Sequence, residues 1–407
     1  MRIPCSQRYD KYLGLLALVG KSRTREFKSI IDRVWKWLQD WKLKLLSQAG
    51  REILLKAVIQ AIPTYCLRVF MLPKTLCSKI NSMMQQFWWG ASGIHWMSWS
   101  KMGTPKSKWG MSFRDFNCFN KALLAKQCWR LWKSPDSLVS RILREKYFAN
   151  SSILEAKLGN KPSYAWISIL GACDILKERL FCKVDGENTR IWGDKWVLIP
   201  TTFAIHYFPR ELNGDAKVAE LINRDCQGWN KELIERLFLP KEVKAILKIP
   251  IDVRRSDMVV WRDTPNGLFT MKNAYHGAMK SLSQLQAESS SIVDRKDLWG
   301  RLWRLKIPNV AKNFLWRACH KILSTKASLF RRKVTTNDLC PICTLKEETC
   351  LHILWSCRSA RDVWNGSIKR FHKSLLNGPS FRSVVEEMMQ VCEEDEFRLF
   401  VEIARRV

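Results

Sequence analysis

Residues 339–357 read LCPICTLKEETCLHILWSC, and this stretch contains the strongest local signal in the chain. Cys340 and Cys343 are separated by two residues, His352 follows after eight further residues, and Cys357 follows after another four. Thiolate and imidazole groups are good zinc ligands, and four protein ligands leave no coordination position for water. The spacing therefore predicts one structural zinc ion held by Cys340, Cys343, His352 and Cys357.

Two other groups of residues are rival ligands for this ion. Cys350 stands two residues before His352, and the pair Cys319 and His320 lies further upstream. The spacing favours His352 and Cys357 over both rivals. The alternative to a metal site is a set of unrelated buried thiols and one histidine.

The sequence contains no residues for a self-sufficient catalytic centre. A zinc deaminase needs a His-x-Glu element and a Pro-Cys-x-x-Cys element, but here proline lies between Cys340 and Cys343, and no His-x-Glu occurs. A Walker A loop, a dinucleotide fingerprint, the His-Glu-x-x-His and Gly-x-Ser-x-Gly motifs, and the adjacent aspartates that hold two metal ions in polymerases are also missing. We therefore predict no catalytic residues in this sequence.

Basic residues predict a polyanionic partner. Lys and Arg outnumber Asp and Glu by 69 to 38, which gives a formal net charge of +31. A positive potential of this size favours RNA or DNA. A solvated basic surface without a dedicated partner and attraction to anionic lipid are the alternatives. The candidate phosphate contacts are Lys28, Arg33, Lys36, Lys42, Lys44 and Arg51.

The spacing of apolar residues predicts a mainly α protein with small β elements (α+β) in two or three domains. A helix over residues 26–38 is expected to bury Phe27, Ile30, Ile31, Val34, Trp35 and Leu38 and to expose Lys28, Arg33 and Lys36. A second helix, capped by Ser47 and stopped by Pro63, is expected to bury Ile53, Leu54, Ala57, Val58 and Ala61.

Cap, turn and linker residues predict further boundaries along the rest of the chain. Ser134 and Pro135 predict the start of a helix that carries Leu138, Val139, Ile142 and Leu143. Asp185-Gly186 predicts a turn between short strands within residues 181–200. The Ser- and Gln-rich stretch 281–291 predicts a loop or linker.

The compartment expected from the sequence is intracellular. The 14 cysteines are scattered and no secretory signal precedes them, so reduced thiols are expected. The apolar run from Leu13 to Val19 is too short to span a membrane, and no membrane partner is expected. Most of the 20 tryptophans are expected in the core, and stacking of bases on clusters such as residues 87–89 and 96–99 is the alternative.

Longer motifs follow one another along nearly the whole chain. They are Lys11-Tyr-Leu-Gly14, Trp41-Lys-Leu-Lys-Leu-Leu-Ser-Gln-Ala-Gly50, Gln60-Ala-Ile-Pro-Thr-Tyr65, Phe87-Trp-Trp-Gly90, Phe119-Asn-Lys-Ala-Leu-Leu-Ala-Lys-Gln-Cys-Trp129, Lys161-Pro-Ser-Tyr-Ala-Trp166, Ile191-Trp-Gly-Asp-Lys-Trp196, Gly267-Leu-Phe-Thr-Met-Lys-Asn-Ala-Tyr275, Phe314-Leu-Trp-Arg317 and Trp364. In this order the chain resembles the C-terminal part of plant LINE-type (non-LTR) retrotransposon reverse transcriptases, including their reverse transcriptase zinc-binding domain.

The resemblance implies a domain order. In that family the segment around Lys11-Tyr-Leu-Gly14 closes the polymerase palm, which here would lie upstream of Met1. The implied domains are 1–75, the end of the palm and a helical thumb-like region; 76–180, a helical Trp-rich region; 181–280, a mixed α/β linker region; 281–370, the reverse transcriptase zinc-binding domain; and 371–407, a helical tail that is expected to be truncated.

The resemblance also implies a function. We expect a nucleic-acid-binding, zinc-binding fragment of an RNA-directed DNA polymerase, with nuclear localisation. Compared with a full-length relative, the catalytic aspartates, the N-terminal endonuclease and the ribonuclease H region are missing, so polymerase activity is expected only if the chain is joined to, or assembles with, a separate palm. A decayed retroelement product with only a structural zinc domain is the remaining alternative.

Overall fold

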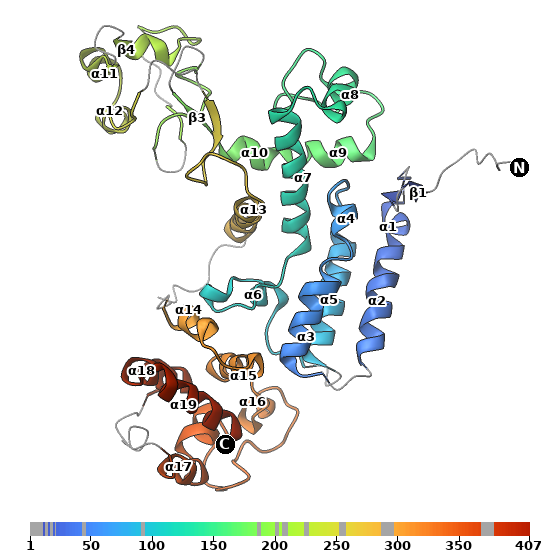
Figure 1. Ribbon diagram of the computed structural model, residues 1–407, viewed down its shortest axis with the longest axis vertical. Coiled ribbons are helices and arrows are strands. Elements are labelled where there is room, and N and C mark those ends of the chain that lie inside the picture. The colour runs from blue at the N-terminus through green and yellow to red at the C-terminus, as the bar shows by residue number, and fades with distance from the viewer. Residues whose placement is uncertain are drawn as a thin grey trace, which may run out of the picture. The chain divides into compact units, whose positions relative to one another are not determined.

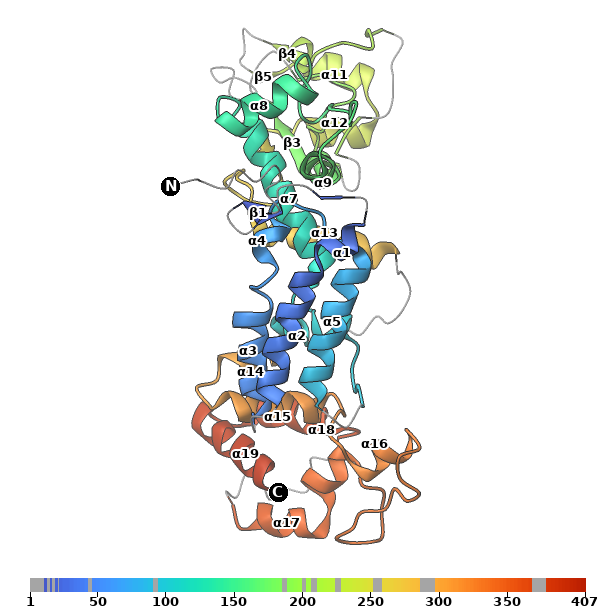
Figure 2. The ribbon, with the colours of Figure 1, turned by 90° about the vertical axis from the view of Figure 1, so that its right-hand side faces the viewer.

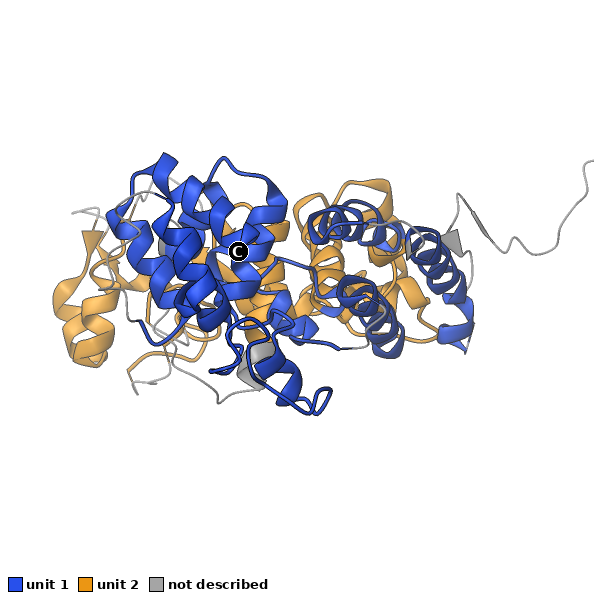
Figure 3. Cartoon of the chain, turned by 90° about the horizontal axis from the view of Figure 1, so that it is seen from below, with its two compact units in different colours: residues 1–65, 72–117, 288–407 blue, residues 66–71, 118–287 orange. Residues whose placement is uncertain are grey.

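A computed structural model describes residues 11–12, 15–16, 19–20, 22–42, 46–90, 94–184, 189–199, 203–205, 211–223, 228–251, 258–285, 297–367 and 378–407. These residues form many helices and a few two-stranded antiparallel sheets, which confirms the predicted fold class. The chain divides into two compact units, each built from separate parts of the sequence (Figure 3). Unit 1 comprises residues 1–65, 72–117 and 288–407, and unit 2 comprises residues 66–71 and 118–287. The domain boundaries at residues 75, 180, 280 and 370 stay predictions.

Unit 1 combines an N-terminal helical bundle with the C-terminal helices (Figure 1). Within the bundle, α2 and α3 both pack against α5, and the three helices lie side by side (Figure 2). The elements are β1 Lys11–Tyr12, β2 Leu15–Leu16, α1 Arg23–Glu26, α2 Lys28–Lys42, α3 Gln48–Leu54, the π-helical η1 Leu55–Ile59, α4 Thr64–Leu67 at the unit boundary, α5 Lys74–Trp89, α6 Trp99–Met102, η2 Lys106–Lys108, α14 Asp297–Arg304, α15 Asn309–Cys319, α16 Lys326–Phe330, the π-helical η4 His352–Ser356, α17 Arg358–Asn365, α18 Phe381–Val391 and α19 Glu394–Arg406.

Helix α2 confirms most of the predicted first helix. The predicted core residues other than Trp35 are buried, while Lys28, Arg33 and Lys36 are exposed. The prediction for Trp35 was wrong, because its side chain is 56% exposed. Trp35 lies about 100° around the helix from Val34, at the edge of the buried face, so the apolar spacing alone could not place it inside.

The second predicted helix has the expected cap but a different buried face. The Ser47 hydroxyl accepts a hydrogen bond from the Gly50 amide at 3.2 Å, as predicted. However, Ile53 is 56% exposed, and the side chains that are buried belong to Ala49, Glu52, Leu55, Ile59 and Gln60. Glu52 was not among the expected core residues, and an isolated carboxylate is costly to bury.

Buried Glu52 is accommodated by three donors. Its Oε1 lies 2.7 Å from Lys56 Nζ and 2.8 Å from Lys106 Nζ, and its Oε2 accepts a hydrogen bond from Asn313 Nδ2 at 3.3 Å. Lys106 also lies over the Trp303 ring, 3.9 Å from its centroid. The carboxylate therefore joins α3, η2 and α15 within unit 1.

The pKa of Glu52 reflects this environment. Burial raises the pKa, but the charges of Lys56 and Lys106 and their hydrogen bonds outweigh it, so the pKa is lowered from the ordinary value of 4.5. A depressed carboxyl pKa means that the ionised form is stabilised more in the folded chain than in the unfolded chain.

Unit 2 contains two hydrophobic cores. One gathers around Trp166 and Trp261, and the other around Trp196 and Ile246. The elements are α7 Phe116–Lys133, which begins in unit 1, α8 Leu138–Tyr147, α9 Tyr164–Leu170, α10 Cys173–Arg179, β3 Leu180–Lys183, η3 Val218–Leu221, β4 Ile222–Asn223, β5 Gly228–Trp229, α11 Lys231–Leu237, α12 Pro240–Ile246, β6 Met258–Trp261 and α13 Met271–Leu285.

Three local predictions fall in unit 2. Strand β3 pairs antiparallel with the distant β6, and the predicted Asp185-Gly186 turn lies outside the described residues. The cap of α8 is Ser137, not Ser134, because the Ser137 hydroxyl accepts from the Ser140 amide and also bonds the Ser140 hydroxyl. Of the predicted linker 281–291, residues 281–285 are the last turn of α13, where the Ser281 hydroxyl donates to the Gly277 carbonyl, and residues 286–291 lie outside the described residues.

The tryptophans at residues 87–89 lie in the core, whereas in the second cluster Trp99 is buried and Trp96 is half-buried. Phe87, Trp88 and Trp89 are all buried, and Trp88 meets Phe113 edge to face at a centroid distance of 5.2 Å. Among the described residues, no helix is both long enough and apolar enough to cross a membrane.

Replacing Glu52→Gln is expected to destabilise the chain by about 2 kcal/mol, because it leaves Lys56 and Lys106 without their buried counter-charge. The cost stays below that of a fully buried pair, since the two lysine side chains are 28% and 33% exposed. Urea unfolding measures the effect. Glu394→Gln is the matched control, because it removes an exposed helical ion pair with Arg398 and should change stability by less than about 0.5 kcal/mol. Equal effects of the two changes would contradict the role given to Glu52.

The same pair of proteins tests the pH dependence. Because the folded-state pKa of Glu52 is lowered, its contribution is fully present above pH 4.5 and is lost as the pH falls through the folded-state value. The unfolding free energies of wild type and Glu52→Gln should differ by a constant amount from pH 7 to about pH 5 and converge at lower pH. A difference that persists in acid would show that Glu52 acts through shape and not through charge.

Candidate metal centre

The first ligand pair lies on a tight turn. Leu339 and Glu347 form an isolated antiparallel bridge, and the Cys340 amide donates to the Lys346 carbonyl at 2.8 Å. Between them, the Thr344 amide donates to the Cys340 carbonyl at 2.9 Å, and Thr344 has φ 56°. This left-handed residue reverses the chain immediately after Cys343, so both sulfur atoms of the Cys-x2-Cys pair face the same side.

The second ligand pair depends on a π-helical turn. In an α-helix, residues five apart point roughly 140° away from each other, which would separate His352 from Cys357. Here the Cys357 amide donates to the His352 carbonyl at 2.7 Å, the i+5 bond of a π-turn that spans η4. The Thr349 hydroxyl accepts from the His352 amide at 3.1 Å and fixes the start of this turn.

The structure brings the four predicted ligands together. Their ligand atoms all lie within 4.8 Å of one another. The Cys340 and Cys357 sulfurs are 4.0 Å apart, and Cys343 Sγ is 3.2 Å from His352 Nε2. Sulfur atoms on one tetrahedral zinc ion, each bonded at about 2.3 Å, lie about 3.8 Å apart. The donor set and its spacing therefore fit a four-coordinate ion with no place for water.

The electrostatics of the site favour metal binding by two of the ligands. Burial lowers the pKa of His352, so its imidazole is neutral at pH 7 and can offer a nitrogen lone pair. Backbone hydrogen bonds from Leu345 and Lys346 lower the pKa of Cys343 and favour its thiolate. Burial raises the pKa of Cys357, so this thiol gives up its proton when a cation compensates the charge.

The rival ligands lie elsewhere. Cys350 is buried but is not part of the four-residue cluster, and burial raises the pKa of its thiol. Cys319 is also buried, and His320 stacks on Trp299 with a centroid distance of 4.9 Å. None of the three side chains is grouped with the four ligands in the described part of the chain.

The turn that carries His352 and Cys357 rests on aromatic packing. Trp364 of α17 donates from Nε1 to the Leu354 carbonyl at 2.9 Å. The same indole stacks on Phe400 of α19 with centroids 5.2 Å apart.

Sequence reasoning missed the supporting residue Thr349, although a threonine three residues before a helical residue is a recognisable cap signal.

Comparison with known proteins assigns this region. The family described as zinc-binding in reverse transcriptase matches residues 269–364, which contain all four clustered ligands. An uncharacterized mitochondrial protein of Arabidopsis thaliana is 41% identical over 147 residues, which are 35% of this chain and 96% of that protein. The chain belongs to the family of this mitochondrial protein. The zinc-binding match supports the expected link to reverse transcriptases.

A second relative extends the similarity along the chain. A putative ribonuclease H protein of Arabidopsis thaliana is 26% identical over 349 residues, or 83% of this chain. The chain spans 55% of the length of that relative, so the relative contains further regions. Both similarities agree with a retrotransposon-derived protein that carries a reverse transcriptase zinc-binding domain.

The candidate phosphate contacts do not form one uniform group. Lys28, Arg33 and Lys36 are exposed along α2. Arg51 is half-buried and has a structural partner, because its Nη1 donates to the Trp88 carbonyl at 3.3 Å, near the end of α5. Lys42 is the last residue of α2, but its side chain is not described. Lys44 lies outside the described residues.

Replacing Cys343→Ser in the full chain is expected to remove the bound ion and to lower the melting temperature by about 10 °C, because metal-binding free energy in such sites is folding free energy. Metal analysis of the purified protein and thermal unfolding with and without a chelator measure both effects. Cys350→Ser is the matched control and should keep the ion, since Cys350 lies outside the cluster. Loss of the ion in Cys350→Ser but not in Cys343→Ser would overturn the ligand assignment.

Proposed function

We propose that the chain is the zinc-binding, nucleic-acid-binding part of a LINE-type retrotransposon reverse transcriptase. The observation that carries this proposal is the Cys3His cluster, which lies inside the segment matched by the reverse transcriptase zinc-binding family. The ion we propose there is a single zinc. With four protein ligands it stabilises the fold and does not activate water.

The charge distribution supports nucleic acid as the partner. Lys28, Arg33 and Lys36 stand on the exposed side of α2, whose opposite side packs against α5. A rigid helix that presents cations at this spacing can contact successive phosphates without sequence preference. The proposed contacts are Lys28, Arg33 and Lys36, and Lys42 and Lys44 stay candidates. Arg51 is not proposed as a contact, because its guanidinium already donates to the Trp88 carbonyl in α5.

Polymerisation is proposed only for a longer assembly. Adjacent aspartates of the kind that bind two metal ions do not occur in this sequence. RNA-directed DNA polymerase activity would therefore need a palm that is joined to this chain or assembled with it. We propose nuclear localisation for such an assembly, because its template and target are nucleic acids.

Neutralising the α2 surface is expected to weaken binding of RNA and DNA. The triple variant Lys28→Gln, Arg33→Gln, Lys36→Gln should bind a short duplex at least about tenfold more weakly and should reduce the slope of log affinity against log salt by about 2 to 3. Fluorescence anisotropy across a salt series measures both quantities on the full chain.

The matched control removes the same charge elsewhere. Lys241, Lys244 and Lys248 are exposed in and after α12, and their triple glutamine variant should change the affinity by less than about twofold. Equal losses in the two triple variants would mean that only net charge matters and would contradict a dedicated α2 surface. Salt-independent or absent binding by wild type would instead favour the decayed product that retains only a structural zinc domain.

A further inference from the structure

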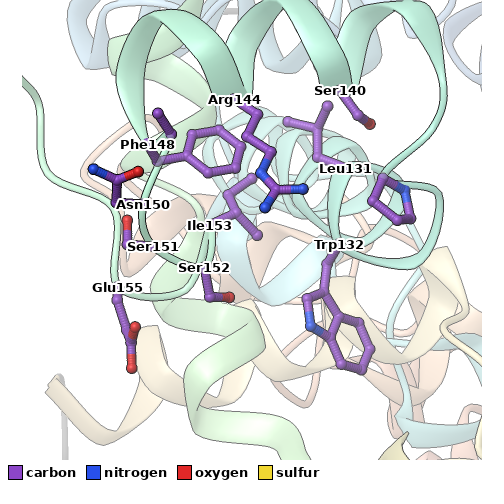
Figure 4. Close-up of a pocket in the computed structure, with 12 residues that line it drawn as sticks. Leu131, Trp132, Ser140, Arg144, Phe148, Asn150, Ser151, Ser152, Ile153 and Glu155 are labelled. Atoms are coloured by element: carbon purple, nitrogen blue, oxygen red, sulfur yellow. The ribbon is translucent and has the colours of Figure 1, made fainter.

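Unit 2 contains a cavity of about 560 Å³ that the proposed function leaves unused. The cavity lies between the end of α7, helix α8 and the segment 149–155 (Figure 4). Its size falls in the range of small-ligand sites. The residues that line it supply both an apolar wall and charged groups.

The apolar wall includes a flat aromatic surface. Leu131, Phe148 and Ile153 are buried and form the inner side of the cavity. The half-buried indole of Trp132 continues this wall, and Lys133 Nζ lies 4.7 Å from the centroid of its ring. Because Lys133 lies over this ring and the Trp129 ring lies 5.3 Å away between centroids, a planar base would stack on the part of the indole that these two side chains leave open.

Two charged side chains that line the cavity, Arg144 and Glu155, are exposed to solvent. The Arg144 side chain points into the cavity among Leu131, Phe148 and Ile153 (Figure 4). Across the described residues, Arg144 forms no ion pair, and Glu155, which also lines the cavity, forms none either. The guanidinium of Arg144 can bind an anion, and the carboxylate of Glu155 can accept hydrogen bonds. Both groups line the same cavity.

We propose that this cavity binds one unpaired nucleotide, with the base stacked on Trp132 and the phosphate on Arg144. The planar base of a nucleotide matches the indole of Trp132, and its phosphate matches the guanidinium of Arg144. Its hydroxyl or amino groups can donate hydrogen bonds to Glu155. A phosphorylated peptide would satisfy Arg144 but would leave the indole wall without a flat partner. The nucleotide is a free one or a splayed-out residue of a bound strand; only the second source rests on the proposed function.

The experiment uses the full chain and a short fluorescent oligouridylate. Arg144→Gln should weaken binding about threefold to tenfold and reduce the salt slope by about 1. Arg141→Gln is the matched control, since Arg141 is exposed on the same helix but does not line the cavity, and it should weaken binding less than about twofold. Trp132→Ala should weaken binding about tenfold, and Trp132→Phe should recover most of the loss because it keeps a stacking ring.

Photocrosslinking gives a readout that does not depend on the stability of a variant. An oligouridylate carrying 4-thiouridine should crosslink to the wild-type peptide that contains Trp132, as mapped by mass spectrometry. Competition by uridine monophosphate would identify a free nucleotide as a ligand, whereas competition by unlabelled oligouridylate alone would identify a strand. Oligothymidylate in the same assay compares DNA with RNA.

The outcomes separate this inference from the proposed function. Salt-dependent strand binding that Arg144→Gln and Trp132→Ala leave unchanged, without a crosslink at Trp132, would overturn the cavity site and keep the proposed function. Losses in the cavity variants but not in the α2 triple variant would support the cavity and overturn the α2 surface. No binding of oligonucleotide or uridine monophosphate would overturn both, and a phosphoserine peptide that binds at Arg144 in place of the oligonucleotide would overturn the nucleotide assignment.

Discussion

The buried carboxylate of Glu52 is the interaction on which the architecture of unit 1 depends. It receives Lys56 from its own helical segment, Lys106 from η2 and Asn313 from α15, and Asn313 is 261 residues further along the chain. Removing such a charge from water is costly, and these donors offset part of that cost. The C-terminal helices are thereby tied to the N-terminal bundle, and Trp316, which donates to the Trp109 carbonyl at 2.7 Å, adds a second tie.

The zinc-binding region is packed against the N-terminal bundle within unit 1. The four ligands are brought together by local elements, a tight turn after Cys343 and a π-turn from His352 to Cys357. The helices around them pack against one another, with α15 contacting both α18 and α19, and α15 also contacts α3 of the bundle. An ion in the cluster would therefore stabilise a part of the chain that is continuous with the basic N-terminal helices of the same unit.

The functional proposals follow from this division of roles. Four protein ligands would leave no open coordination position on a zinc ion, which is the arrangement of a structural site. The exposed cations of α2 belong to the same unit, whereas the cavity beside Trp132 and Arg144 belongs to unit 2. Backbone phosphates and a single unpaired nucleotide are different features of one kind of partner, and they call for different surfaces.

The helical fold class, the clustering of the four ligands, the Ser47 cap and the exposed cations of α2 could all be predicted from the amino-acid sequence. These features depend on short spacings or on the type of one residue, so they are already present in the local pattern. The tertiary structure determined which face of the second helix is buried, because Glu52 becomes a core residue through Lys106 and Asn313, which are distant in sequence. It also decided that Trp35 is exposed and that Arg51 holds the end of α5, since both depend on which neighbour covers a helix edge. The cavity between α7 and α8 also depends on the tertiary structure. Its lining side chains come from several segments, and local residue spacing does not predict how these segments pack together.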